Sequence, residues 1–167
     1  MPEPLVVRSA PTPAHPSMQL KDYFDPDAVS LSIRGGSKEE ILAELVGLLR
    51  MDERSSGTLL RVLQRRENLG STGVGRGIAI PHCRSLVVSR LRLAYGRMPS
   101  GSDFQAIDSR PVFNFFLIVA PPLEISNQYL PALGKIAQFA KEPDIPDRLA
   151  ALKTPAEFFR LLEEKGV

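Results

Sequence analysis

The sequence has no tryptophan, a single cysteine and only two histidines among its 167 residues. Because one cysteine, Cys83, excludes an internal disulfide and is typical of a reducing compartment, we expect a cytoplasmic protein. The two histidines, His15 and His82, and one cysteine do not make a tetrahedral zinc site without carboxylates. We therefore expect no metal and no cofactor, and any histidine chemistry must depend on one or two side chains.

Long apolar runs are also missing. The longest, Val112 to Ala120, is interrupted by Asn114 and falls far short of the roughly 20 residues that a membrane-spanning helix needs. The segment from Met1 to Met18 does not have a positive start followed by an apolar stretch, so no signal peptide is predicted. We expect no membrane insertion.

The formal net charge is only +2, but its distribution along the chain is uneven. Arginines crowd the stretch between Arg50 and Arg97, where the acidic residues are Asp52, Glu53 and Glu67. This stretch can meet phosphate or an acidic partner, or it can be an ordinary solvated face. Nucleic-acid binding through this stretch is the weakest alternative, and strongly salt-dependent affinity would be its signature; no nucleic-acid partner is expected.

Composition divides the chain into a tail and a domain. Prolines, alanines and serines dominate residues 1–17, which are predicted to form a flexible, proline-rich tail. The remaining residues, 18–167, belong to a chain that is 43% hydrophobic, which is enough for one domain with a core.

Helical and strand patterns interleave along this domain. Val29, Leu31 and Ile33 alternate with serine and arginine, which predicts a strand. Two capping boxes, beginning at Ser37 and Thr154, predict helix starts. Further helices are predicted over residues 53–67 and 126–141, and further strands over 78–80, 91–95 and 112–119. The inward face of helix 126–141 is predicted to consist of Leu130, Leu133, Ile136, Ala137 and Ala140. The pattern predicts a single-domain α/β fold.

A glycine-rich loop precedes the second histidine. Gly70, Gly73, Gly75 and Gly77 lead into a short apolar stretch that ends at Pro81-His82. A Walker loop is excluded because lysine and then serine or threonine must follow its last glycine. A dinucleotide fingerprint is excluded because it needs a strand before the glycines and a helix after them.

The position of His82 is compatible with phosphoryl chemistry. Pro81 has no N–H, so the chain should leave the sheet there and present His82 at the end of a strand, where α/β proteins concentrate their sites. A neutral imidazole, with a pKa near ~6.5, is a nucleophile at neutral pH. The alternative is an ordinary histidine beside a tight turn. Cys83 should point to the opposite face, so a Cys/His pair is not expected.

Residues 70–82 read Gly-Ser-Thr-Gly-x-Gly-x-Gly-Ile-Ala-Ile-Pro-His, and Arg66-Glu67-x-Leu69 stands just before them. This pattern resembles the active-site signature of the fructose/mannitol/nitrogen-regulatory type of EIIA domain of the bacterial phosphotransferase system. The similarity extends over about residues 18–162. It includes Leu20-Lys21-Asp22-Tyr23-Phe24, Phe104-x-Ala106-Ile107-Asp108 and the apolar run from Val112.

The resemblance implies an α/β domain with a mixed sheet flanked by helices. It also implies a phosphotransferase component in which His82 accepts a phosphoryl group from HPr or its nitrogen-branch counterpart, with Arg66 assisting. Ser71, Thr72 and Arg76 are further candidates for phosphate binding, although the two hydroxyls can equally shape the loop. Arg84 is also near enough in sequence to reach the same phosphate.

One position departs from the family pattern. Typical members have a second histidine, in the pattern His-Leu-x-x-Leu, at the start of the long helix, where this chain reads Tyr129-Leu130-Pro131-Ala132-Leu133. We expect Tyr129 to lie within side-chain reach of His82, where its phenol can donate a hydrogen bond to a phosphoryl oxygen.

Three functions stay open at this point. The first is a free-standing regulatory carrier of the nitrogen type, which the short chain without an attached transport segment favours. The others are the EIIA component of a fructose/mannitol-type transporter, passing the group to an EIIB, and a degenerate module that controls a regulated protein by binding alone.

Overall fold

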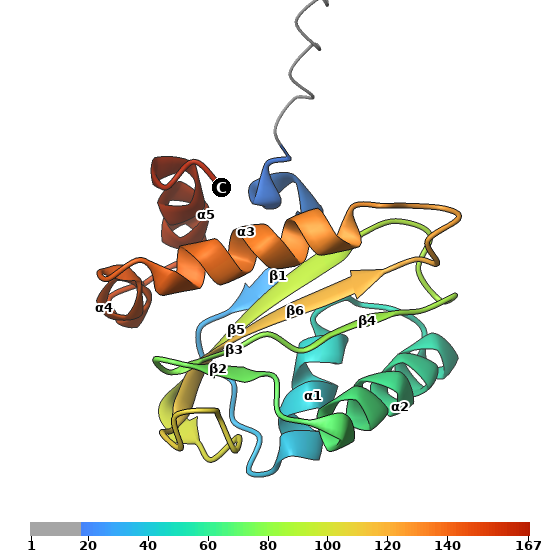
Figure 1. The fold of residues 1–167 in the computed structure, drawn as a ribbon, viewed down its shortest axis with the longest axis horizontal. Helices are drawn as coiled ribbons and strands as arrows, with labels where there is room; N and C mark the ends of the chain where they lie inside the picture. Colours follow the sequence, from blue (N-terminus) through green and yellow to red (C-terminus); the bar gives the residue numbers. More distant parts are fainter. Residues whose placement is uncertain (1–17) are drawn as a thin grey trace, which may run out of the picture.

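A six-stranded mixed sheet organises residues 18–167, which are the residues that this computed structural model describes (Figure 1). The predicted tail, residues 1–17, lies outside the described residues. The strand order is β1-β5-β6-β3-β2, with β4 also paired to β6. The strands are β1 (Phe24–Ser30), β2 (Gly73–Gly75), β3 (Ile78–Ala79), β4 (His82–Arg84), β5 (Arg92–Ser102) and β6 (Val112–Ala120).

Strand β6 is the centre of this sheet. It runs antiparallel to β5 and parallel to both β3 and β4. The two short strands pair with successive parts of β6, since Ile78 lies opposite Asn114 and His82 lies opposite Ile118. The glycine loop therefore leads along β6 and delivers His82 near the carboxyl end of that strand.

The helices begin where the capping patterns place them. Ser37 accepts a hydrogen bond from the backbone N–H of Glu40, and Thr154 accepts one from Glu157, so both predicted N-caps are confirmed. The helices are α1 (Lys38–Gly47), α2 (Glu53–Leu69), α3 (Tyr129–Lys141), α4 (Ile145–Ala150) and α5 (Pro155–Glu164), after a 3₁₀ turn, η1 (Leu20–Tyr23).

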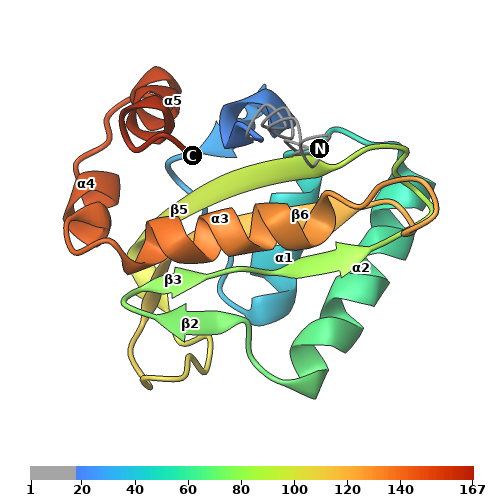
Figure 2. The ribbon, with the colours of Figure 1, turned by 45° about the horizontal axis from the view of Figure 1, so that its top comes forward.

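Helices cover both faces of the sheet (Figures 1 and 2). Phe116 and Ile118 of β6 share a core with α3, α4 and α5, whereas Phe115, Leu117 and Val119 share a core with α1 and α2. This alternation is why the β6 sequence is apolar almost throughout. The predicted α/β fold, with a mixed sheet flanked by helices, is confirmed.

Several predicted elements differ in their limits, and the strand predicted over 91–95 extends to Ser102. The strand predicted over Val29–Ile33 ends at Ser30, although the Ile33 N–H still donates to the Arg97 carbonyl at 2.8 Å. Helix α3 begins at Tyr129 rather than Ser126. The reason is Pro131, which has no N–H to donate and is therefore accommodated in the first turn of a helix.

The inward face of α3 was also predicted incorrectly in part. Leu130 is 68% exposed, and the buried side chains are Ala132, Ile136, Phe139 and Ala140. The buried stripe is rotated from the predicted face, so that Phe139 packs in the core, Leu130 does not, and Leu133 and Ala137 are only partly buried. The short helix α4 was not predicted.

Candidate functional site

His82 is the first residue of β4, a strand of only three residues that pairs with β6. The prediction that the chain leaves the sheet at Pro81 is therefore wrong: Pro81 only interrupts the pairing between β3 and β4. Side chains alternate along a strand, so His82 and Arg84 share one face and Cys83 takes the other. Cys83 is buried in the core beneath α1 and α2, and burial raises the pKa of its thiol to about 12. The expectation that Cys83 does not pair with His82 is confirmed.

The ring of His82 is oriented by its own backbone. Its Nδ1 lies 2.6 Å from the carbonyl oxygen of Ile80. Since a carbonyl only accepts hydrogen bonds, Nδ1 carries the proton and the lone pair of the neutral ring is on Nε2. Burial lowers the pKa of His82, and the charge of Arg66 lowers it further, while the Ile80 hydrogen bond and Glu67 act in the opposite direction. His82 is therefore neutral at pH 7.

Tyr129 lies against His82 at the start of α3. The two ring centroids are 5.9 Å apart, so the predicted proximity of these side chains is confirmed. The guanidinium of Arg84 also lies over the tyrosine ring, with Cζ 4.6 Å from the centroid. Burial raises the pKa of Tyr129 to about 12, so the phenol stays neutral and can donate a hydrogen bond.

Arg66 approaches His82 from α2. Its Nη1 donates to the carbonyl of Gly70 at 2.8 Å, which ties the last turn of α2 to the beginning of the glycine loop. The positive charge of Arg66 lowers the pKa of both His82 and Tyr129. The structure thus brings Arg66, His82 and Tyr129 together from three separate elements.

Glu67, next to Arg66 in the last turn of α2, also holds the loop. Its buried carboxylate accepts from the Thr72 backbone N–H at 3.0 Å and from the Thr72 hydroxyl at 2.7 Å. It also pairs with Lys38 of α1 at 3.3 Å. Sequence reasoning did not assign Glu67 a role, although it stands directly beside Arg66 in the motif.

The two loop hydroxyls hold the backbone of the loop. The hydroxyl of Thr72 donates to Glu67, and the hydroxyl of Ser71 donates to the Phe104 carbonyl at 2.6 Å. Ser71 also accepts from the Gly73 N–H at 3.1 Å. Of the two roles considered for Ser71 and Thr72, these contacts favour shaping the loop over binding phosphate.

Arg76 is not brought to His82. Its guanidinium donates to the carbonyls of Ala140 and Glu142 at 2.7 and 2.8 Å, where it caps the C-terminal end of α3. Tyr129 is at the other end of this 13-residue helix, about 20 Å away at the usual rise per residue. Arg84, which the sequence left open, is the arginine that the fold places beside Tyr129.

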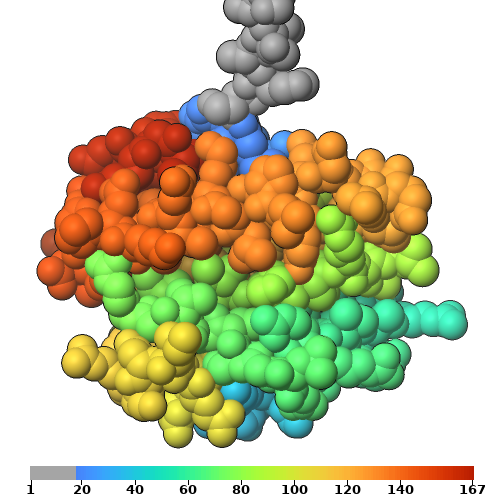
Figure 3. All heavy atoms as spheres, in the orientation of Figure 1, coloured from blue at the N-terminus to red at the C-terminus, as the bar shows by residue number. Residues whose placement is uncertain are grey.

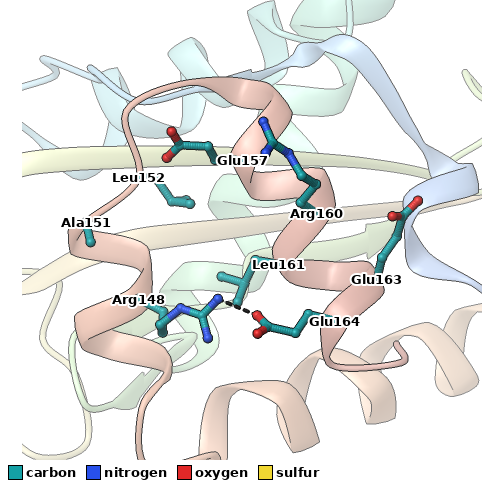
Figure 4. Close-up of a pocket in the computed structure, with 8 residues that line it drawn as sticks. All are labelled: Arg148, Ala151, Leu152, Glu157, Arg160, Leu161, Glu163 and Glu164. Atoms are coloured by element: carbon teal, nitrogen blue, oxygen red, sulfur yellow. Dashed lines mark hydrogen bonds and ion pairs between the residues drawn. The ribbon is translucent and has the colours of Figure 1, made fainter.

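A separate cavity of about 630 Å³ lies between α4 and α5 (Figure 4). Arg148 pairs there with Glu164, and the other lining side chains include Arg160, Glu157 and Glu163. The lining is of mixed charge and contains none of the site residues predicted from the sequence. It therefore gives no competing candidate for phosphoryl chemistry.

Two negative findings apply to residues 18–167. No helix there is long and apolar enough to cross a membrane. No cluster of three or more histidine, cysteine, aspartate or glutamate side chains in this part of the chain could hold a metal ion.

A half-buried, neutral imidazole at the first residue of a short strand, beside an arginine and a glycine loop, defines a candidate phosphoryl-transfer site on an α/β domain. Residues 22–165 match the family described as phosphoenolpyruvate-dependent sugar phosphotransferase system, EIIA 2. The chain belongs to this family, whose members are phosphoryl-carrier components.

The most informative relatives are nitrogen regulatory proteins. The chain is 31% identical to the one from Pseudomonas aeruginosa, over 87% of this chain and 95% of that protein. It is 30% identical to the one from Bradyrhizobium diazoefficiens, with the same coverage. The crystal structure of nitrogen regulatory protein IIA-Ntr from Neisseria meningitidis superposes with a TM-score of 0.78 at 28% identity, covering 86% of this chain and 98% of that one.

Proposed function

We propose that this protein carries a phosphoryl group on Nε2 of His82. It would act in the cytoplasm as a transferase component of a phosphotransferase system. The observation that supports this most directly is the contact between Nδ1 and the Ile80 carbonyl, 2.6 Å long, which leaves the Nε2 lone pair for attack. The donor is HPr or its nitrogen-branch counterpart. The family membership supports the reaction class.

The transfer is a displacement at phosphorus. The Nε2 lone pair of His82 forms a new N–P bond while the N–P bond of the donor's phosphohistidine breaks, and the released electron pair returns to the donor's ring nitrogen. If both rings keep a proton on their other nitrogen, as His82 does through Ile80, no proton has to move.

Arg66 and Tyr129 stabilise the transferred group in different ways. The phosphoryl group carries roughly two negative charges, which the cation of Arg66 attracts through charge-assisted bonds. The neutral phenol of Tyr129, with its pKa raised to about 12, donates a hydrogen bond without adding charge. Arg66 is therefore the main source of electrostatic stabilisation, and Ser71 and Thr72 act through the shape of the loop.

Of the three functions considered, that of a free-standing regulatory carrier is the best supported. The relatives that this chain covers along nearly their full length are named nitrogen regulatory proteins. The first alternative is the EIIA component of a fructose/mannitol-type transporter, in which His82 passes the group to an EIIB. A degenerate module that acts by binding alone is the second alternative, and Tyr129 in place of the family's second histidine is the observation that favours it.

The test is phosphorylation in vitro. Incubation with phosphoenolpyruvate, enzyme I and HPr should attach one acid-labile phosphate, and His82→Ala should abolish it. Label retained by His82→Ala would refute the assignment of the residue. Absence of label on the wild-type protein, with both HPr and its nitrogen-branch counterpart, would leave the binding module as the function.

A further inference from the structure

Arg84 projects from the same face of β4 as His82. The two residues are separated by one position, so their side chains leave the strand in one direction, about 7 Å apart along it. Both residues are half-buried. In Figure 3 the yellow-green surface of the segment that follows β4 adjoins the orange surface of the segment before α3. Arg84 lies where these segments meet, because it contacts Pro121, Ser126 and Tyr129.

Both side chains contact one aromatic ring. The Cζ atom of Arg84 is 4.6 Å from the centroid of the Tyr129 ring, and the centroid of the His82 ring is 5.9 Å from it. The positive charge of Arg84 acts to lower the pKa of Tyr129, against the larger effect of burial. Arg84 is therefore a second cation, besides Arg66, next to the residues that would hold a phosphoryl group.

One edge of the Arg84 guanidinium is engaged and the other is free. Its Nη1 donates to the carbonyls of Pro121 at 2.9 Å and Ser126 at 3.3 Å, which fixes the position of the side chain. Within residues 18–167, Nε and Nη2 have no hydrogen-bond partner, and no carboxylate forms an ion pair with Arg84. These two nitrogens are not buried, so they are open to a ligand. Adjacent N–H groups of this kind bind two oxygens of a phosphate in parallel.

We propose that Arg84 binds the phosphoryl group of phosphorylated His82 through its Nε–Nη2 edge, as a second cation beside Arg66. This inference rests on the proposed function and adds a phosphate-binding residue to that site. The phosphoryl group carries roughly two negative charges, of which Arg66 balances one. Tyr129 supplies a neutral phenol where typical family members have a second histidine, so the remaining charge needs another cation. The Nη1 contacts hold Arg84 in place for this role.

The experiment titrates the phosphorylated protein and follows the ³¹P NMR shift of its phosphohistidine. A nearby cation favours the doubly charged form of the phosphoryl group, so Arg84→Gln should raise the pH midpoint of the shift by about one unit. Arg84→Lys keeps the charge but not the paired N–H groups, and should raise the midpoint less. In exchange with phosphorylated HPr, the equilibrium constant for labelling should fall about tenfold in Arg84→Gln.

These readouts separate phosphate binding from a merely structural role. If Arg84 only anchors the carbonyls of Pro121 and Ser126, Arg84→Gln will lower the free energy of unfolding and leave the ³¹P midpoint unchanged. The matched control is Arg160→Gln, which changes an exposed arginine on α5, in the lining of the separate cavity between α4 and α5. It should leave both the midpoint and the equilibrium constant as in the wild type.

The wild-type protein provides a measurement that does not depend on the folding of Arg84→Gln. The Nε–H NMR signal of Arg84, assigned by its absence from Arg84→Lys, should shift when His82 is phosphorylated, because the N–H gains a charged acceptor. A labelled wild type in which this signal does not move, or in which Arg84→Gln leaves the ³¹P midpoint unchanged, would overturn the role of Arg84 and leave the carrier function intact. A wild type that takes no label from either HPr or its nitrogen-branch counterpart would overturn both.

Discussion

The guanidinium of Arg84 lies over the ring of Tyr129, with Cζ 4.6 Å from the ring centroid. Arg84 is fixed there by hydrogen bonds from Nη1 to the carbonyls of Pro121 at 2.9 Å and Ser126 at 3.3 Å. The tyrosine ring therefore has both a cation and the His82 ring as neighbours, the latter with its centroid 5.9 Å away. A neutral phenol, which can donate a hydrogen bond, belongs to the side chain beside His82.

Replacing Tyr129 and Arg66 should affect phosphoryl transfer unequally. Arg66→Ala removes a cation and should slow transfer about 100-fold or more, which is the usual cost of losing a stabilising donor at a developing charge. Tyr129→Phe removes one neutral hydrogen bond and should slow it less than tenfold. Tyr129→His introduces a group that titrates near neutral pH and should change the rate measurably. Single-turnover phosphorylation rates give all three values.

The relative sizes of these rate losses show whether Arg66 or Tyr129 is the main stabiliser of the transferred phosphoryl group. Arg54→Ala, which changes an exposed arginine near the start of the same helix, is the charge-matched control and should leave the rate unchanged. A loss with Tyr129→Phe as large as that with Arg66→Ala would show that the phenol, and not the cation, stabilises the transferred group.

Phosphoryl transfer should stay active below the ordinary pKa of histidine. Burial, reinforced by Arg66, lowers the pKa of His82, so its nucleophilic neutral form persists as the pH falls through ~6.5. The transfer rate, measured against pH with a fixed amount of phosphorylated donor, should therefore decline with a midpoint below ~6.5. In the Arg66→Ala variant this midpoint should move upward, because the cation no longer opposes protonation. A midpoint at or above ~6.5 in the wild type would contradict the burial of the ring.

The same shift makes stability depend on pH with a defined sign. The pKa of His82 is lower in the folded than in the unfolded protein, so the unfolded state binds more protons below ~6.5. The contribution of neutral His82 to the free energy of unfolding is complete above that pH. It is lost as the pH falls towards the pKa that His82 has in the folded protein. Urea unfolding at about pH 7.5 and about pH 5 should show a smaller loss of stability in His82→Gln than in the wild type.

The sequence predicted the surroundings of His82 only in part: Tyr129 lies beside it, whereas Arg76 does not. The glycine loop and Pro81 predicted that the chain leaves the sheet at His82, but His82 begins β4, which stays in the sheet beside β6. The proximity of Tyr129 was also predicted correctly, although the inward face assumed for its helix wrongly included Leu130. That prediction rested on this helix register and on the place where the resemblance puts a second histidine, and the resemblance was the sounder of the two grounds.

What the sequence did not reveal depends on tertiary contacts. Arg76 stands in the loop, but its guanidinium reaches the end of α3, because the carbonyls of Ala140 and Glu142 need donors. Arg84 reaches Tyr129 because the chain between Pro121 and Ser126 turns its carbonyls towards it. No local spacing encodes either path, so neither role was predictable from one sequence.

Glu67 should be required for the shape of the glycine loop. Glu67→Ala would leave the Thr72 N–H and hydroxyl without their shared acceptor in a buried position, and Lys38 without its partner. We expect a loss of about 1–3 kcal/mol in the free energy of unfolding, together with slower phosphorylation. Urea unfolding and transfer rates check both.

The exposed Glu39 of α1 provides the control for Glu67. Glu39→Ala should change stability by less than about 0.5 kcal/mol, as is usual for surface substitutions. An unchanged transfer rate in a destabilised Glu67→Ala variant would show that the hydrogen bonds between Glu67 and Thr72 stabilise the fold but do not position His82.

Gly96 and Ile33 should be energetically coupled. A Cβ atom added at Gly96 would lie 1.8 Å from Cδ1 of Ile33 and 2.9 Å from Cδ2 of Leu45, so Gly96→Ala forces the core apart. We expect Gly96→Ala to destabilise the protein by about 1–3 kcal/mol. Ile33→Val alone should cost about 0.5–1.5 kcal/mol, because it removes a buried methyl group. In the double variant the missing Cδ1 makes room for the new Cβ, so the combined loss should be smaller than the sum.

The coupling follows from unfolding free energies of the wild type, both single variants and the double variant. A favourable interaction of about 1 kcal/mol or more would establish that Gly96 is glycine because Ile33 occupies the space of its side chain. Rescue stays partial, since Leu45 still crowds the same Cβ position. Additivity within about 0.5 kcal/mol would mean that the backbone of β5 moves to accommodate alanine, and that the packing of Ile33 does not restrict this position.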